Sequence, residues 1–216
     1  VDGSTTMRNY SLSDKPGQDY FRISVKKETG SEANSPKGYV SNKLHDEIKV
    51  GDTVEIGPPC GDFFLNIHSK HGHPVVLLAA GVGITPILSI LKTALEILPD
   101  REVIFVHGCL NEEVQAFKAT VDELEKEHSK LTVYYRYSNP LKDGMKYEGN
   151  TSEGFVDAEL IESLFSSLDA DYYFCGPKPF MVNVYQKLHA WGICKSQVHF
   201  EFFGPLQELE NSGATK

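Results

Sequence analysis

The stretch PVVLLAAGVGITP at residues 74–86 decides the fold of the C-terminal part of the chain. Residues 75–80 form a continuous apolar run, the pattern of a strand buried on both faces of a parallel sheet. The glycines that follow predict a tight turn, and Thr85 before Pro86 predicts a helix start with Thr85 as N-cap. Amides at a helix start attract a pyrophosphate. Pro86, however, replaces the third glycine of the dinucleotide-binding pattern GxGxxG, and an ordinary turn explains this loop equally well.

The sequence after residue 86 continues the alternation of strand and helix. We expect helices to begin near Asn111, Asp157 and Lys178, and a polar loop over 138–153. Strands that alternate with helices predict an α/β fold with a doubly wound parallel sheet. The five predicted strands are residues 75–80, 103–107, 131–137, 171–175 and 198–203.

Residues 1–68 show short segments and turns instead. Apolar and polar side chains alternate over 19–28, and Asp14-Lys15-Pro16-Gly17 before them is a turn signal. A short helix is expected over 41–48 with Ser41 as its cap. This predicts a partial antiparallel barrel with too few strands to close. The expected domains are this barrel at 1–68, a nucleotide-binding domain at 73–206 and a flexible polar tail at 207–216.

Composition narrows the class of function. The 216 residues carry a formal net charge of −9, which argues against nucleic acid or an anionic membrane as a partner. The longest apolar run, residues 74–80, is too short to cross a bilayer. The four cysteines show no CxxC spacing, so we expect no metal site and the reduced thiols of a cytoplasmic protein.

The predicted strand ends carry the residues that favour a ligand. In an open parallel sheet, ligands bind beyond the carboxyl ends of the strands. Gly81-Val82-Gly83 follows one strand and Cys175-Gly176-Pro177 follows another, and glycines let a ligand approach the backbone closely. Two such ends together favour a dinucleotide site. His107 is interpreted as a strand-end residue and not as a base.

Two further candidate sites lie in the N-terminal part. Alternation places Arg8 and Tyr10 on one face, so a guanidinium that can hold a pyrophosphate lies beside an aromatic plane. An exposed hairpin strand also explains this pair, and residue physics alone favours that explanation. Gly38-Tyr39-Val40-Ser41 is a turn into a helix start, which suits either a phosphate or ordinary capping by Ser41.

These residues carry a resemblance to a known family. Six motifs follow in the order typical of the ferredoxin-NADP reductase superfamily, and within it the chain is similar to the reductase part of flavohaemoglobins, the nitric oxide dioxygenases. The resemblance covers about residues 7–206. The motifs are Arg8-Asn9-Tyr10-Ser11, Gly38-Tyr39-Val40-Ser41-Asn42, Gly61-Asp62-Phe63-Phe64, Gly81-Val82-Gly83-Ile84-Thr85-Pro86, Cys175-Gly176-Pro177 and Glu201-Phe202-Phe203-Gly204-Pro205.

The resemblance implies a role for each motif. Residues 1–68 would bind FAD and residues 73–206 would bind NAD(P). Arg8 and Asn9 would hold the FAD pyrophosphate, Tyr10 would stack on the flavin and Ser11 would hydrogen-bond near its reactive nitrogen. The backbone of Gly38, Tyr39, Val40 and Ser41 would bind phosphate and ribityl oxygens, and Gly81 to Pro86 would hold the nicotinamide cofactor's pyrophosphate. Cys175, Gly176 and Pro177 would lie beside the nicotinamide. Phe203 would cover the other face of the flavin, and Glu201 would tune the flavin's potential. The other implied cofactor-binding residues of this segment are Phe202, Gly204 and Pro205. The implied catalytic residues are Tyr10, Ser11, Cys175 and Glu201.

The implied activity is electron transfer from NADH through FAD to a haem in a globin. Asn111-Glu112-Glu113 after the second strand favours NADH over NADPH, whereas Arg136 would favour NADPH. This sequence does not include the family's first barrel strands or its globin, so we expect either a longer native protein or FAD binding that is weak or lost. The alternatives are a reductase for another haem or iron-sulfur partner and a non-catalytic nucleotide-binding or interaction domain.

Overall fold

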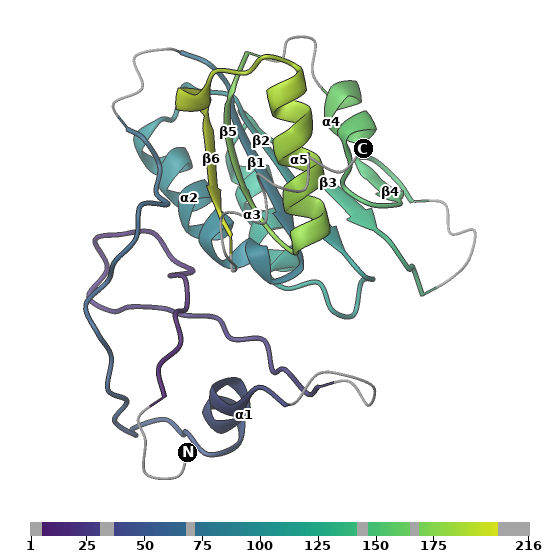
Figure 1. Cartoon of the computed structure of the whole chain (residues 1–216). Coiled ribbons are helices and arrows are strands. Elements are labelled where there is room, and N and C mark those ends of the chain that lie inside the picture. The colour runs from purple at the N-terminus through teal and green to yellow at the C-terminus, as the bar shows by residue number, and fades with distance from the viewer. Residues whose placement is uncertain (1–5, 31–36, 68–71, 142–146, 165–168, 203–216) are drawn as a thin grey trace.

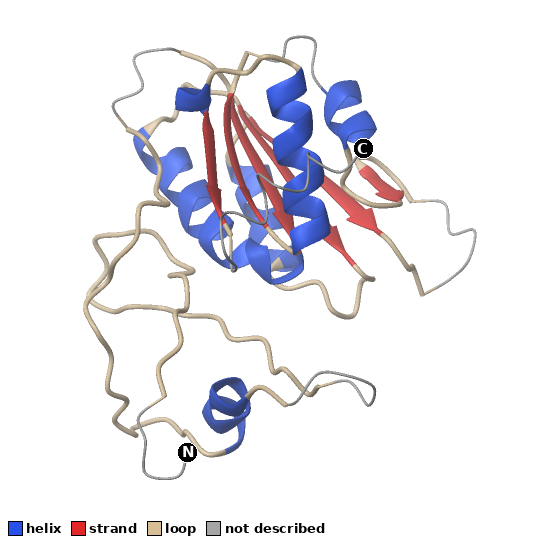
Figure 2. Ribbon diagram, viewed as in Figure 1, coloured by secondary structure: helices blue, strands red, loops and turns tan. Residues whose placement is uncertain are grey.

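In the computed structural model, residues 6–30, 37–67, 72–141, 147–164 and 169–202 are described. The C-terminal part is an α/β domain around one parallel sheet in the strand order β4-β3-β2-β1-β5-β6 (Figures 1 and 2). The strands are β1 Val75–Ala80, β2 Val103–Cys109, β3 Leu131–Tyr137, β4 Thr151–Glu153, β5 Asp171–Cys175 and β6 Val198–Glu201. The helices are α1 Tyr39–Asp46, α2 Ile84–Ile97, α3 Lys118–Glu127, α4 Ala158–Leu164 and α5 Lys178–Ala190, with 3-10 turns at Gly81–Gly83 and Lys195–Gln197.

Helices cover both faces of the sheet, as the predicted doubly wound fold requires (Figure 1). On one face, α2 packs over β1, β2 and β5, α3 packs over β3, and this face holds one apolar core. On the other face, α4 and α5 enclose a second core. Val75 to Ala79 in β1 are fully buried, which explains why this strand has apolar residues on both faces.

The sheet has six strands. The prediction of five strands was wrong because it did not include the short edge strand β4. Thr151–Glu153 lies in the segment predicted as a polar loop, where no apolar alternation marks a strand. Its three residues pair in parallel with β3 from Tyr135 to Tyr137. At the sheet edge this strand needs no buried face, so the pattern that identifies the central strands is missing.

Two helix starts in the C-terminal part differ from the prediction. Thr85 lies inside α2, whose N-cap is Gly83, and its hydroxyl donates to the Val82 carbonyl at 3.1 Å. The helix expected near Asn111 begins only at Lys118. Phe117 before it has a φ of 62°, a left-handed conformation that interrupts the helical path. Asp157 does cap α4, because its Oδ1 accepts the Leu160 amide at 2.9 Å.

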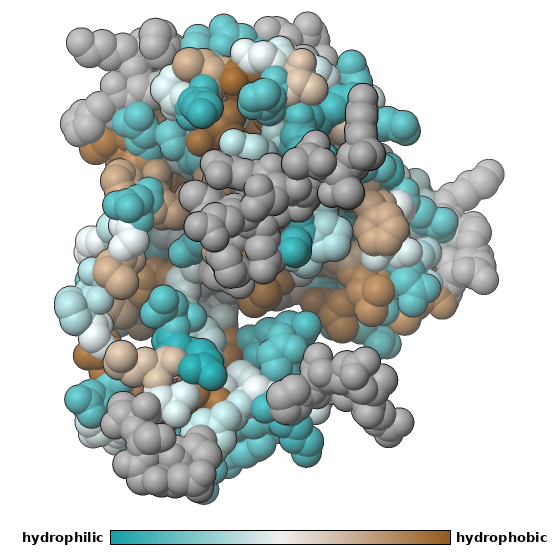
Figure 3. Space-filling model, viewed as in Figure 1, coloured by the Kyte–Doolittle hydropathy of each residue, from teal (hydrophilic) through white to brown (hydrophobic). Residues whose placement is uncertain are grey.

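The N-terminal part contains α1 and long connecting segments. Over residues 6–30 and 37–67, one antiparallel bridge joins Leu12 to Ile23, so the predicted barrel stays a prediction. Several apolar side chains of this part are exposed, including Phe21, Ile56 and Phe64, and Figure 3 shows brown side chains among polar ones there. The apolar alternation read from the sequence is therefore present without a matching buried face.

Candidate functional site

The carboxyl ends of β1 and β5 meet at the centre of the sheet, where the chain order reverses. The loops that follow these two strands are in direct contact. A Cβ atom built on Gly83 would lie 2.0 Å from the Cys175 carbonyl oxygen and 2.7 Å from the Gly176 nitrogen. Only glycine at position 83 allows the two loops to approach this closely, so the two predicted glycine motifs form one site.

The donor groups of this site suit an anion. Helices α2 and α5 both begin here, both lie within the described residues, and neither has a side-chain cap or an acidic residue in its first turn. Gly81 has a φ of 52° and open space where a Cβ would stand. A helix start, which presents the positive end of the helix dipole, together with an open glycine turn fits the pyrophosphate of a dinucleotide.

Three of the predicted catalytic residues lie together next to these loops. The Ser11 hydroxyl donates to Glu201 Oε2 at 2.7 Å, across 190 positions of sequence. Glu201 ends β6 and is paired with Cys175 on β5. Burial, and in second place the charge of Glu201, raises the pKa of Cys175, so this residue is a neutral thiol at physiological pH. The N-terminal part and the last strand therefore meet at the edge of the sheet where the parallel strands have their carboxyl ends.

Arg8 and Tyr10 remain close to one another on this N-terminal segment. Arg8 is exposed and its Nη1 donates to the Met7 carbonyl at 2.7 Å, and Asn9 beside it is exposed. Tyr10 is half-buried; its burial raises the pKa of the phenol and the Arg8 charge acts in the opposite direction. A cation and an aromatic ring thus lie within electrostatic reach of each other, two residues before Ser11.

Hydrogen bonds within the chain occupy polar groups of the Gly38 turn. Helix α1 begins at Tyr39, two residues before the predicted start, so Ser41 is not its N-cap. The buried Ser41 hydroxyl donates to the Gly38 carbonyl at 3.1 Å and accepts the Glu28 amide at 3.3 Å. Figure 1 shows α1 at the end of the N-terminal part that lies away from the sheet.

The last predicted motif is described only in part. Phe202 packs against the core on the α5 face, and Phe203, Gly204 and Pro205 lie outside the described residues. The chain beyond the carboxyl end of β6 is therefore described only up to Phe202.

His107, interpreted from sequence as a strand-end residue, lies buried behind the glycine loop. Its imidazole hydrogen-bonds to the Gly81 backbone, and Cys109 Sγ is 3.3 Å from Nε2. Burial lowers the pKa of His107 to about 4, so the ring is neutral at physiological pH. The sequence contained no signal for this contact, because a functional histidine and a hydrogen-bonded core histidine look the same in a strand pattern.

Acidic and aromatic side chains gather where β2 and β3 end. The Tyr147 hydroxyl donates to Glu112 Oε1 at 2.5 Å, and the rings of Tyr147 and Tyr137 are 5.4 Å apart. Glu113 is exposed. Arg136 is held elsewhere, because it donates to the Phe155 carbonyl at 3.2 Å and to Ser152 Oγ at 3.1 Å. Of the charged residues predicted to set cofactor preference, Glu112 is the one held among the aromatic rings.

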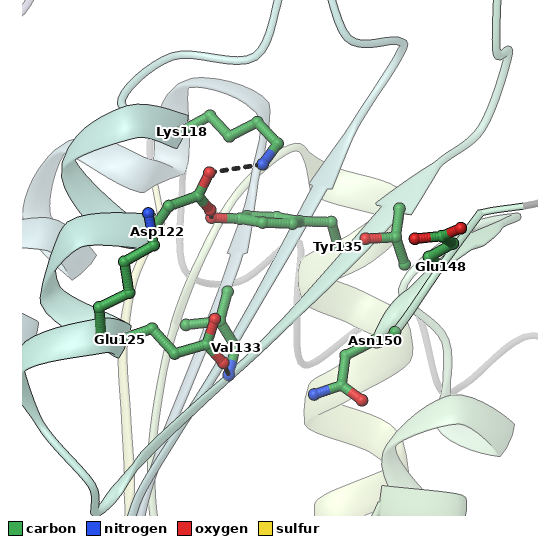
Figure 4. Close-up of a pocket in the computed structure, with 10 residues that line it drawn as sticks. Lys118, Asp122, Glu125, Val133, Tyr135, Glu148 and Asn150 are labelled. Atoms are coloured by element: carbon green, nitrogen blue, oxygen red, sulfur yellow. Dashed lines mark hydrogen bonds and ion pairs between the residues drawn. The ribbon is translucent and has the colours of Figure 1, made fainter.

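A polar hollow of about 400 Å³ lies apart from this edge, between α3 and the β3–β4 edge of the sheet (Figure 4). Its side chains are paired with one another. Lys118 contacts Asp122 at 2.6 Å, the Tyr135 hydroxyl donates to the same carboxylate at 2.8 Å, and Glu125 accepts the Val133 amide at 2.8 Å. None of the predicted site residues lines this hollow, so the cofactor motifs do not point to it.

Two further findings concern metal sites and membrane-spanning helices. Across the described ranges, no group of three or more His, Cys, Asp or Glu side chains is placed to hold a metal ion. Each helix in the part of the chain that the structure describes is too short or too polar to cross a membrane.

Comparison with known proteins agrees with this geometry. A family model described as an oxidoreductase NAD-binding domain matches residues 77–187, and one described as an oxidoreductase FAD-binding domain matches residues 1–65. The flavohemoprotein of Bacillus thuringiensis subsp. konkukian is 42% identical over 97% of this chain and 52% of that protein. The flavohem-like FAD/NAD-binding domain of nitric oxide dioxygenase from Vibrio cholerae has a TM-score of 0.76 at 34% identity, over 92% of this chain and 77% of that one. The cytochrome b5 reductase domain of Ulva prolifera nitrate reductase has a TM-score of 0.74 at 25% identity, over 93% of this chain and 80% of that one.

The fold, the paired glycine loops and these matches define an FAD- and NAD-binding oxidoreductase. The chain belongs to the ferredoxin-NADP reductase family, close to the reductase parts of flavohaemoglobins. It spans about half the length of the curated relatives it matches, 52% for the Bacillus thuringiensis protein.

Proposed function

We propose that the chain is the reductase module of a flavohaemoglobin-type nitric oxide dioxygenase, which carries electrons from NADH through FAD to a haem held in a globin. The chemistry that FAD would supply when held by these residues is acceptance of a hydride from NADH and release of the electrons one at a time, as a haem acceptor requires. The names of the relatives, flavohemoprotein and nitric oxide dioxygenase, support this choice of acceptor. The cytoplasm is the proposed location, and the free state of all four cysteines is compatible with it.

The observation that carries the proposal is the Ser11–Glu201 hydrogen bond of 2.7 Å beside Cys175. It joins the motif proposed to contact the flavin to the strand that ends beside the nicotinamide loop. Hydride transfer needs the two reacting rings to be held about 3–3.5 Å apart, so the two halves of the chain must meet at one place. The contact of Ser11 with Glu201, beside Cys175, supports such a meeting point at the carboxyl ends of β5 and β6.

Each motif receives a role in this proposal. Ser11 orients the flavin through its hydroxyl, Glu201 places a negative charge near it, and Cys175 fills the space beside the nicotinamide as a neutral thiol. His107 holds the Gly81 loop from behind. The proposed cofactor contacts are Arg8, Asn9, Tyr10 and Ser11 and the backbone of Gly38, Tyr39, Val40 and Ser41 for FAD, Gly81, Val82, Gly83, Ile84, Thr85, Pro86, Cys175, Gly176 and Pro177 for the nicotinamide cofactor, and Phe202, Phe203, Gly204 and Pro205 at the border of the flavin.

A spectrum and an anaerobic reduction test the proposal. The chain mixed with FAD and desalted is expected to keep the visible bands of an oxidised flavin, and NADH is expected to bleach them. A ferric globin added afterwards is expected to become ferrous. A colourless chain that takes up no FAD would contradict the redox proposal and favour a nucleotide-binding or interaction domain. Reduction of a ferredoxin but of no globin would reassign the acceptor.

Replacement of Arg8 is expected to weaken FAD binding. The exposed guanidinium can form two charge-assisted hydrogen bonds with a pyrophosphate, and their loss costs on the order of 1.5–3 kcal/mol, or tenfold or more in affinity. Fluorescence titration of FAD with Arg8→Ala and with the parent chain measures the difference. Lys26→Ala, which removes another exposed cation of the same part, is the matched control. Equal FAD affinity in Arg8→Ala and the parent would remove Arg8 from the site.

The chain is expected to prefer NADH over NADPH by on the order of tenfold or more in kcat/KM. The Glu112 carboxylate held by Tyr147 can accept a ribose hydroxyl and repels a 2′-phosphate. Glu112→Gln should reduce the preference, and the exposed Glu113→Gln should leave it unchanged. Stopped-flow flavin reduction with the two nucleotides gives the ratio. A preference for NADPH in the parent chain would overturn the assignment of Glu112.

A further inference from the structure

A polar joint connects the N-terminal part to helix α2. Ser89, Lys92 and Glu96 lie on one side of α2 with helical spacing. Ser89 and Lys92 contact Asp14, and Glu96 contacts Lys15. The Ser89 hydroxyl donates to the Asp14 carbonyl at 2.7 Å. Figure 1 shows the purple N-terminal segment beneath α2. We call these five residues the α2 joint.

The Asp14 carboxylate is the centre of this joint. Lys92 Nζ lies 2.9 Å from Oδ1, Arg22 Nη1 lies 2.7 Å from Oδ2, and the Tyr20 hydroxyl donates to Oδ2 at 3.0 Å. The carboxylate is only 9% exposed and Lys92 is 19% exposed. Burial on its own raises the pKa of Asp14. The hydrogen bonds from Lys92, the Lys15 amide and Tyr20 together lower this pKa by more, so the net pKa is below its ordinary value and the carboxylate is ionised.

The joint ties together the two segments that form the proposed redox site. Asp14 lies three residues after Ser11, a span of at most about 11 Å of extended chain. The Leu12–Ile23 bridge and the Ser13 amide, which donates to the Arg22 carbonyl at 2.8 Å, fix the segment between them. Helix α2 follows directly from the Gly81–Gly83 turn. A shift of Asp14 along α2 would therefore move Ser11 relative to Glu201 and to the glycine loop.

We propose that Asp14, through Lys92 and Ser89 of α2, is a positioning residue that fixes the flavin half of the chain against the nicotinamide half. The inference rests on the proposed function, and Asp14 itself contacts neither cofactor. Its effect is on the distance between the reacting rings, which decides the hydride-transfer rate, and not on the affinity for either cofactor.

The second ion pair of the joint provides the matched control. Lys15 and Glu96 are in contact, but their side chains are 36% and 55% exposed. Exposed pairs contribute little to stability, whereas removing one partner of a largely buried pair leaves a charge without its counter-ion and costs considerably more. Both pairs join the same segment to the same helix, so burial is the main difference between them.

Amide hydrogen exchange in the cofactor-free full chain tests the joint first. Asp14→Asn and Lys92→Met are expected to speed exchange over residues 11–14 by on the order of tenfold, because the segment opens more often. Lys92→Arg is expected to restore protection, and Glu96→Gln is expected to leave it unchanged. Equal exchange in Lys92→Met and Glu96→Gln would overturn the proposal, whatever the chain does with FAD.

Stopped-flow reduction of the FAD-loaded chain tests the consequence. Lys92→Met and Asp14→Asn are expected to lower the flavin-reduction rate at saturating NADH by about three- to tenfold. The affinities for FAD and NADH are expected to change less than twofold, a separation that a general loss of structure would not produce. An unchanged rate in both variants would overturn the proposal while leaving the proposed function intact, whereas a parent flavin that NADH does not reduce would overturn the proposed function itself.

Discussion

Gly83→Ala is expected to lower the free energy of unfolding by about 3 kcal/mol and to weaken NADH binding by tenfold or more. The added Cβ would lie 2.0 Å from the Cys175 oxygen and 2.3 Å from its carbonyl carbon, where ordinary contacts begin at 3.4 Å. These neighbours are backbone atoms, which cannot rotate away as a side chain can. The two loops must therefore separate by more than about 1 Å, and this moves the amides proposed to hold the pyrophosphate.

Urea unfolding and calorimetric titration with NADH measure both effects, and two glycines serve as controls. Gly57 has open space around it, so Gly57→Ala should be neutral or stabilising by about 0.4–1 kcal/mol. Gly81 also has open space but a φ of 52°, so Gly81→Ala should lower the free energy of unfolding by about 1–2 kcal/mol through backbone strain. Because Gly81 is itself a proposed nucleotide contact, this variant is a control for the unfolding measurement only. If Gly83→Ala matches Gly57→Ala in both measurements, the two loops do not need their close contact.

The sheet was predictable because its strands are defined by local pattern. Strand β1 is a continuous apolar run, and β5 has two tyrosines, a phenylalanine and a cysteine after its initial Asp171. Both strands end where the sequence predicted the glycine loops to begin. The edge strand β4 was missed because Thr151, Ser152 and Glu153 bury no face and pair over three residues only. The late start of α3 was missed because Phe117 adopts a left-handed conformation, which normally indicates glycine. A phenylalanine at this position gives no sign of it in the sequence.

The site was predictable only in part, because its decisive contacts join residues far apart in the chain. Periodicity alone could place Ser11 and Glu201 on a strand but could not bring them together across 190 positions; the family resemblance supplied that expectation. Asp14 was recognised only as a turn residue. Its contact with Lys92 spans 78 positions and depends on how the two parts of the chain pack. Charged side chains on a helix surface give no indication of such a partner.

Acidification is expected to destabilise the chain through His107 before most carboxylates titrate. Burial lowers the pKa of this imidazole to about 4, against 6.5 in the unfolded chain, so the unfolded state binds more protons between these values. The stability that the neutral ring contributes is complete above pH 6.5 and is lost as the pH falls towards 4. The difference of 2.5 pH units corresponds to about 3 kcal/mol, of which about 2 kcal/mol should disappear between pH 7 and pH 5.

Substitution separates this contribution from other titrating groups. His107→Gln keeps a neutral donor for the Gly81 backbone but cannot gain a proton, so its stability should fall by about 2 kcal/mol less than that of the parent between pH 7 and pH 5. His189→Gln, at an exposed position on α5, is the matched control and should follow the parent. Urea unfolding at the two pH values gives the differences. If His107→Gln and the parent lose the same free energy, the ring is not held neutral behind the glycine loop, and acid sensitivity must come from carboxylates such as Asp14, whose lowered pKa places its effect at lower pH.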